Sequence, residues 1–144
     1  MTVAIINTDM NIGPFKIPGN GQNMILNNYA DRYKITVEEI IPEPFMSNSL
    51  ATTQWTQKKK KLDKIILCSI HQLPQEKKRI NNLINSMKKV EFHFALENVH
   101  GSGKKFLMKC IKEAKIFKKA TTIDSTKISW SALYNLKIKK NKKK

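Results

Sequence analysis

The chain has 144 residues and a mass of 16.6 kDa, which suits one domain and is tight for two. Apolar residues make up 40% and charged residues 26%, a balance that permits a packed core and argues against global disorder. With 27 basic and 11 acidic residues, the formal net charge is +16, which is typical of proteins that meet nucleic acid or anionic membranes.

The first part of the chain predicts a strand, a long loop, a helix and a second strand. The β-branched run at 2–7 is typical of a strand. Residues 8–21 contain two Pro and three Gly and predict a long loop of the kind that often carries function. Apolar spacing predicts a helix over 22–34. A strand over 35–41 should end at Pro42, because proline cannot donate to a sheet.

The middle of the chain alternates helices and strands. We expect helices over 49–62, 75–89 and 103–119, strands over 64–70 and 90–96, and a loop over 98–103. Strands that alternate with helices predict βαβ units and a mainly parallel α/β sheet. We assign 1–119 to a single α/β domain.

The last 25 residues, 120–144, hold seven Lys and one Asp. Such a composition is typical of a solvated tail, so we expect a basic, partly disordered C-terminal extension. Within it, 128–138 carries Trp130 and Tyr134. This segment is read either as a fifth strand or as a docking segment for a partner enzyme.

Several classes of protein are disfavoured by the sequence. No apolar run approaches the roughly 20 residues that cross a bilayer, and the beginning of the chain lacks the pattern of a secretory signal. Cys68 and Cys110 are too few for a disulfide framework and match no zinc spacing. We therefore expect a cytoplasmic protein with no membrane span, no metal, no cofactor and two inert core thiols.

Polar residues gather where the predicted strands end, which is where ligands bind in parallel sheets. These residues are Asn7, Thr8, Asp9, Ser69, His71, Gln72, Glu97, Asn98 and His100. Strand alternation puts His93 on the opposite face from Phe92 and Phe94, and predicts a histidine that packs on a helix or lines a pocket edge. Ser69 lacks the glycine pattern of a nucleophile elbow.

A glycine-containing segment precedes the last helix. Residues 101–105 (GSGKK) are similar to a P-loop but do not satisfy its pattern, because Asn98 and Lys105 occupy positions that need Gly and Ser or Thr. Glycines before a helix N-terminus leave backbone N–H groups free for an anion. The candidate phosphate-binding residues are therefore Gly101, Ser102, Gly103 and Lys104, with a plain flexible loop as the alternative.

One resemblance concerns residues 4–11 (AIINTDMN), which resemble the first strand and nucleophile loop of resolvase-type serine recombinase catalytic domains. Asn7 stands where that family has its serine, and Ile5 where it has a strand arginine. The resemblance therefore implies no strand exchange. It does imply a flavodoxin/resolvase-like three-layer sandwich, with a mainly parallel sheet of four to five strands in the order 2-1-3-4.

A second resemblance covers most of residues 3–119. Three blocks, Ile17-Pro18-x-x-x-Gln22-Asn23, Ser69-x-x-Gln72-Leu73-Pro74 and His93-Phe94-Ala95-x-Glu97, are similar to motifs of the sporadic carbohydrate cluster protein family. Those are small bacterial proteins found beside genes for surface polysaccharide and lipopolysaccharide synthesis. The resemblance implies a role in that biosynthesis, with a sugar or nucleotide-sugar as ligand.

The first functional hypothesis is therefore a protein that binds or modifies a sugar at the carboxyl edge of the sheet. Its candidate substrate-binding residues are Gln22, Asn23, Ser69, Gln72 and Asn98, because amides and hydroxyls bond sugar hydroxyls. Glu97 and His93 are its candidate catalytic pair. Whether the protein is an enzyme is left open.

A catalytically inactive, resolvase-like nucleic-acid-binding module is the alternative. It rests on the net charge, but 25 of the 27 basic residues are Lys, and Arg32 and Arg79 are the only arginines. Arginine is the usual choice for phosphate and guanine contacts, and an A/T-rich codon bias also yields Lys, Asn and Ile. We therefore rank this hypothesis second, and a docking scaffold for a partner enzyme third.

Overall fold

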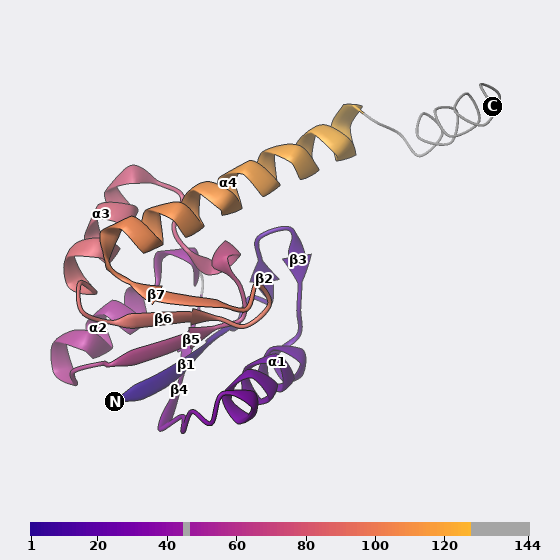
Figure 1. The fold of residues 1–144 in the computed structure, drawn as a ribbon. Helices are drawn as coiled ribbons and strands as arrows, with labels where there is room; N and C mark the ends of the chain where they lie inside the picture. Colours follow the sequence, from indigo (N-terminus) through magenta and orange to yellow (C-terminus); the bar gives the residue numbers. More distant parts are fainter. Residues whose placement is uncertain (45–46, 128–144) are drawn as a thin grey trace.

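The computed structural model describes residues 1–44 and 47–127. A five-stranded sheet lies at its centre (Figure 1). Its strands, in spatial order, are β4 (Glu39–Glu43), β1 (Thr2–Asn7), β5 (Lys64–Leu67), β6 (Glu91–Phe94) and β7 (Val99–Ser102). The first four are parallel and β7 is antiparallel to β6. The four parallel strands thus follow the predicted order, and β7 adds an edge where a loop was expected.

Four α-helices cover the sheet, and a small hairpin follows β1. The helices are α1 (Gly19–Arg32), α2 (Ala51–Lys59), α3 (Lys77–Ser86) and α4 (Gly103–Lys127). The hairpin is β2 (Asn11–Ile12) and β3 (Phe15–Lys16). It occupies part of the predicted loop over 8–21. The α/β class is confirmed, and α4 continues past the predicted end at 119. The predicted fifth strand over 128–138 lies outside the described residues.

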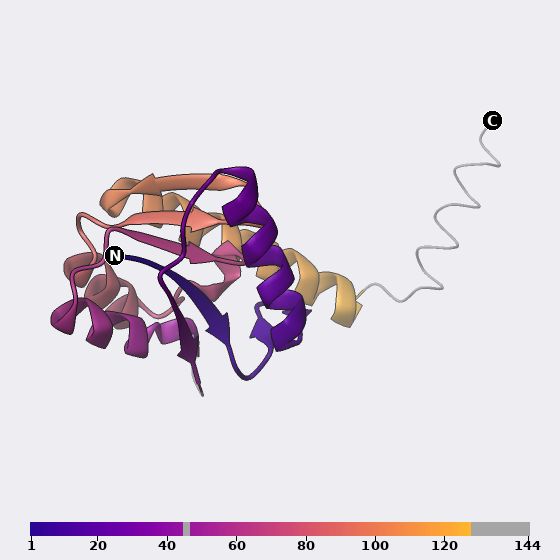
Figure 2. The same cartoon turned by 90° about the horizontal axis from the view of Figure 1, so that it is seen from below.

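Side-chain alternation along the strands separates two hydrophobic layers. Figure 2 shows α1 crossing one face of the sheet, with the other helices behind it. On the α1 face, Ala4 and Ile66 pack with Leu26 and Tyr29. The opposite face carries the larger core, in which strand residues meet α3 and α4. Its largest fully buried side chains include Phe92 and Phe94, as the alternation around His93 predicts.

The strand over Glu39–Glu43 corrects one expectation. Pro42 was expected to end a strand over 35–41, but it lies inside β4 and pairs in register with Ile6. β4 is the outer strand of the sheet. A proline is tolerated there because its missing N–H faces away from the ladder. The strand therefore begins and ends later than the sequence pattern indicated.

A buried carboxylate caps the first turn of α2. Glu43, at the end of β4, is 1% exposed. Its Oε1 accepts hydrogen bonds from the N–H of Thr53 at 2.6 Å and from the Thr53 hydroxyl at 2.7 Å. Its Oε2 accepts from the N–H of Thr52 at 3.3 Å. The residue before the helix, Leu50, has a φ of 52° and provides no side-chain cap, so Glu43 supplies the acceptor and the negative charge that a helix N-terminus favours.

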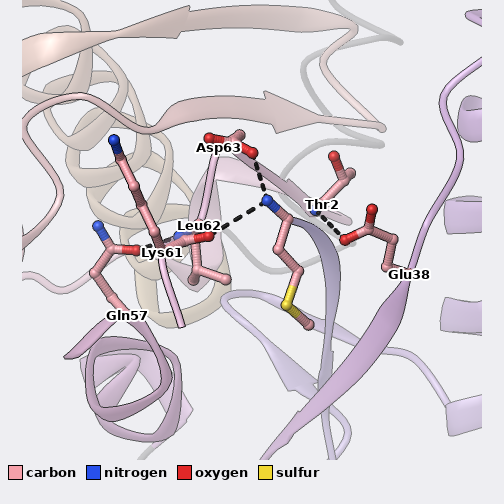
Figure 3. A network of polar contacts seen from close by, with 7 residues as sticks. Thr2, Glu38, Gln57, Lys61, Leu62 and Asp63 are labelled. Carbon is pink, nitrogen blue, oxygen red and sulfur yellow. Dashed lines mark hydrogen bonds and ion pairs between the residues drawn. The ribbon is translucent and has the colours of Figure 1, made fainter. Parts of the chain in front are cut away.

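Polar contacts fix the other end of β1 (Figure 3). The Met1 amino group donates to the carbonyl of Lys61 at 3.3 Å and forms an ion pair with Asp63. That ion pair lowers the pKa of Asp63 below its usual value. The N–H of Thr2 donates to Glu38 Oε2 at 3.2 Å. These contacts lie where the parallel strands begin. A ligand was expected at the opposite end, where the strands finish, and other residues hold that end.

Candidate functional site

Three buried amide side chains hold the carboxyl ends of β1 and β5 together. Gln22 of α1 accepts from the N–H of Asn7 at 2.8 Å and donates to its carbonyl at 2.9 Å. Gln72 accepts from the N–H of Cys68 at 2.8 Å and donates to Asn7 Oδ1 at 3.0 Å. Asn7 Nδ2 donates to the carbonyl of Asn11 at 2.8 Å. All three amides are at most 1% exposed, and their buried polar groups are paired as burial requires.

The same geometry gives Gln22 and Gln72 a structural role. Gln22 Nε2 also donates to the carbonyl of Ile17 at 2.8 Å, and Gln72 Oε1 also accepts from the N–H of Ser69 at 3.2 Å. Both amides are therefore engaged at their oxygen and at their nitrogen inside the protein. They position the strand ends, and their substrate-binding roles stay predictions.

Glu97, expected as a catalytic residue, holds the turn that follows β5. Its Oε2 accepts from the hydroxyl of Ser69 at 2.8 Å, and its Oε1 accepts from the N–H of Ile70 at 2.7 Å. Ser69 Oγ also accepts from the N–H of His71 at 3.2 Å and so caps the 3-10 helix Ile70–Gln72. Ser69 is fully buried, whereas Glu97 is half-buried. The Glu97 carboxylate therefore accepts hydrogen bonds from two donors in the turn after β5.

His93 lies on the other side of the sheet and does not pair with Glu97. Its ring packs on α1, and Nδ1 lies 2.7 Å from the hydroxyl of Tyr29. Nε2 lies 3.3 Å from Glu91 Oε1, and the ring stacks on that of His100 at 5.1 Å. Burial lowers the pKa of His93, although Glu91 opposes the shift. The expected helix-packed histidine is confirmed, and among the described contacts none joins it to Glu97.

The predicted phosphate loop is partly a strand. Gly101 and Ser102 belong to β7, and α4 begins at Gly103 with a φ of 89°. A Cβ at Gly101 would lie 2.7 Å from the ring of Phe106, so this glycine permits close packing. Lys104 is exposed in the first turn of α4. The phosphate-binding roles of Gly101, Ser102, Gly103 and Lys104 stay predictions, with Gly101 and Ser102 now placed in the edge strand β7.

Asn98 and Asn23, two further candidate substrate-binding residues, differ in their surroundings. Asn98 is exposed, has a φ of 55°, and accepts a hydrogen bond from the hydroxyl of Tyr33. Asn23 is half-buried beside Gln22 in α1. Their ligand-binding roles stay predictions.

An aromatic cluster joins the hairpin to α4, and no pattern in the sequence indicated it. The ring of His71 lies 5.8 Å from that of Phe15 in β3 and 5.2 Å from that of Phe117 in α4. Burial lowers the pKa of His71, while Glu97 acts in the opposite direction. Between β2 and β3, Gly13 has a φ of 59° and faces His71. Two-residue strands carry too short a pattern for sequence analysis to detect them.

Gly13→Ala should destabilise the protein by about 1–3 kcal/mol, because the site combines a left-handed backbone with no room for a methyl group. An added Cβ would lie 2.5 Å from His71 Cβ. Gly19→Ala is the matched control, because a Cβ there meets nothing within 4 Å and alanine suits a helix. Urea unfolding of both variants measures the difference. Equal stability of the two variants would contradict the packing of the hairpin on His71.

The two cysteines are buried, and burial keeps their thiols protonated. Cys68 and Cys110 are buried and unpaired. Burial raises the pKa of Cys68 to about 12 and that of Cys110 to about 11, so both thiols stay protonated near neutral pH. Within residues 1–44 and 47–127, no group of His, Cys, Asp and Glu could hold a metal ion. Over the same part of the chain, the helices are too short or too polar to cross a membrane.

Among the described helices, α4 carries the most lysines. Residues 104–119 contain seven lysines and a single acid, Glu113. The inner side of the helix is set by Leu107, Cys110, Ile111 and Ala114, which are buried. Five exposed lysines follow one another at spacings of three and four residues along the outer side: Lys105, Lys109, Lys112, Lys115 and Lys119. We call these five residues the lysine stripe. Figure 1 shows α4 running past the edge of the sheet.

Comparison with known proteins identifies a likeness of fold. No protein-family model matches the chain, and no curated protein matches it. A solved structure that it resembles is the crystal structure of the N-terminal catalytic domain of TP901-1 integrase, at a TM-score of 0.54 and 14% sequence identity. The match covers 85% of this chain and 97% of that domain.

The chain shares its fold with an integrase catalytic domain. This supports the resolvase-like α/β architecture that the residues around Asn7 implied. At 14% identity, the likeness concerns the fold alone. Nothing in the comparisons supports the resemblance to the sporadic carbohydrate cluster family.

Proposed function

We propose that this protein binds nucleic acid through the lysine stripe of α4 and does not cut it. The observation that carries the proposal is the stripe itself: five exposed lysines at helical spacing on a helix that runs past the sheet. Like charges three and four residues apart destabilise an isolated helix. A polyanion laid along the stripe would remove that repulsion and release its own counterions.

Codon bias accounts for the number of lysines but not for their placement. In residues 104–119 one acid accompanies seven lysines, whereas residues 20–50 contain four acids and two basic residues. Residues 104–119 therefore carry a net charge of +6, seven lysines less one acid, on a single helix. Lysine is a flexible point charge that suits phosphate contacts without base readout, so we expect binding with little sequence preference.

We expect no cleavage of the nucleic acid because of the residue that stands at the expected nucleophile position. Asn7 stands where the resolvase-type family has serine, and its side chain is 1% exposed. Its amide is bonded on one side to Gln72 and on the other to the carbonyl of Asn11. A buried amide has no hydroxyl to attack a phosphate, and the fully buried Ser69 hydroxyl is engaged with Glu97.

Sugar binding at the strand edge is less well supported by this geometry. Gln22 and Gln72 are occupied within the protein, so a sugar or nucleotide-sugar would depend on the accessible side chains of Asn23, Glu97 and Asn98. A role in surface-carbohydrate synthesis therefore stays a prediction that follows from the sequence blocks. The docking role of Trp130 and Tyr134 concerns residues outside those that the structure describes.

Binding to a labelled 20-base-pair DNA duplex should be steeply salt-dependent. Each neutralised phosphate contributes about −0.9 to the slope of log K against log salt. A triple variant, Lys109→Gln with Lys112→Gln and Lys115→Gln, should make that slope shallower by about 2–3 and weaken binding at least tenfold at low salt. Fluorescence anisotropy at several salt concentrations measures both quantities, and gel analysis of the duplex checks for cleavage.

A second triple variant removes the same charge elsewhere. Lys61, Lys88 and Lys89 are exposed residues outside α4, and their change to Gln should alter affinity far less. If the two triple variants lose the same affinity, binding follows net charge and the lysine stripe is not a site. If the unaltered protein shows no binding at low salt, or cuts the duplex, the proposal fails.

A further inference from the structure

A hollow between α2 and α3 combines an exposed tryptophan with two cations. It has a volume of about 300 Å³, and its lining includes Trp55 and Lys58 of α2 with Arg79 and Asn82 of α3. Trp55 is 61% exposed, an unusual position for the largest apolar side chain. Neither the fold nor the proposed role of α4 requires an indole at this place.

Polar contacts hold Gln54, one of the residues that line the hollow. Gln54 Nε2 donates to the carbonyl of Ser49 at 2.9 Å, and Gln54 Oε1 accepts from the hydroxyl of Ser86 in α3 at 3.1 Å. Gln54 thus bridges the segment before α2 to α3. Because Gln54 and Trp55 are neighbours in α2, the indole is presented from a helix that is already anchored.

The charges at the hollow favour an anion. Its lining contains Lys58 and Arg79 but no carboxylate. Glu76, one turn before Arg79 in the chain, lies 3.4 Å from Arg79 Nε. That contact is exposed and therefore weak, and a guanidinium has five N–H donors. The Lys59 amino group also lies 5.6 Å from the Trp55 ring centroid, so a third cation is close to the indole.

We propose that this hollow is a binding site for a nucleoside phosphate, either free or as part of a single strand. The base would stack on Trp55, and the phosphate would meet Arg79 and Lys58. Aromatic stacking combined with flanking cations is the general means by which unpaired bases are held. The volume is at the lower end of the roughly 300–1,000 Å³ range of small-ligand pockets, which suits one nucleotide. The inference does not depend on duplex binding by the lysine stripe.

Tryptophan fluorescence tests the site directly. The chain has two tryptophans, so the Trp130→Phe variant leaves Trp55 as the only indole. We expect adenosine monophosphate and a short oligo(dT) to quench its emission saturably, and inorganic phosphate alone not to do so. Saturable quenching by the nucleotide alone would identify a free nucleotide as the source, and by the oligonucleotide alone, a single strand. Absence of quenching by both at millimolar concentration overturns the proposal.

Variants separate stacking from general charge attraction. In calorimetric titrations, Trp55→Ala should weaken binding of the same ligand about tenfold or more, and Arg79→Gln should also weaken it. The control is Lys34→Gln, which removes one exposed charge just after α1, outside both the hollow and the lysine stripe, and should leave this affinity unchanged. If Trp55→Ala binds as the unaltered protein does, or if Lys34→Gln weakens binding as much as Arg79→Gln, the hollow is not the site. Failure of duplex binding would leave these outcomes unaffected.

Discussion

Gln72→Leu should lower the free energy of unfolding by about 3–5 kcal/mol, the largest loss that we expect from a single polar substitution in this protein. The change leaves three groups without their partner: the N–H of Cys68, the N–H of Ser69 and Asn7 Oδ1. Each buried group left unpaired costs about 1–3 kcal/mol. Leucine is close to glutamine in size, so lost hydrogen bonds and not a cavity should dominate.

Urea unfolding measures this loss, and the melting temperature should fall by roughly 10 °C. Gln75→Leu is the matched control, because it makes the same chemical change three residues later at a half-buried position. We expect a change within about 1 kcal/mol for the control. A loss below about 1 kcal/mol for Gln72→Leu would show that the amide network does not hold the strand ends.

The sequence identified Gln22 and Gln72 as important residues, and the structure shows a structural role for each. A polar residue at the carboxyl end of a strand is typical both of a ligand-binding group and of a group that ties loops together. Both side chains are completely buried, which favours the second role, and their ligand-binding role stays a prediction. For Gln22, the buried contacts include Ile17, which lies in the predicted loop over 8–21, and a loop prediction does not specify the path of the chain.

The parallel core of the fold was predictable because its periodic signals are strong. β5 is mostly apolar, and β6 alternates between charged or polar residues and phenylalanine. α3 has apolar residues at helical spacing. β7 was missed because Val99–Ser102 is largely exposed and contains His and Gly, so it lacks a strand pattern. Its pairing comes from the antiparallel register with β6, a tertiary contact that no local signal encodes.

The proposed function follows from the sequence only in outline. Net charge suggested nucleic acid as a partner, but composition does not show where lysines gather. The lysine stripe becomes visible once the inner side of α4 is fixed by Leu107 and Ala114. The sequence analysis likewise assigned no role to Trp55. No local sequence pattern indicates that Arg79, in another helix, lines the same hollow.

Glu43→Ala should lower the free energy of unfolding by about 2–4 kcal/mol. The substitution removes the acceptor for the N–H groups of Thr52 and Thr53 and for the Thr53 hydroxyl. Hydrogen bonds to charged groups contribute about 1.5–3 kcal/mol, and a helix N-terminus without its anion loses a further favourable interaction. Glu43→Gln keeps one acceptor oxygen, so we expect it to lose roughly half as much.

Glu39→Ala separates the capping role from a general effect of charge. Glu39 is on the same strand and carries the same charge, but it is exposed and its partner is Lys60 at 3.2 Å. An exposed pair of this kind is worth at most about 1 kcal/mol, so Glu39→Ala should be nearly neutral in urea unfolding. The backbone carbonyl of Glu43 accepts from the N–H of Thr8 at 3.0 Å and keeps this contact in every variant. A difference between the two alanine variants therefore reports the side chain at the start of α2, and equal losses would show that the buried carboxylate is not its cap.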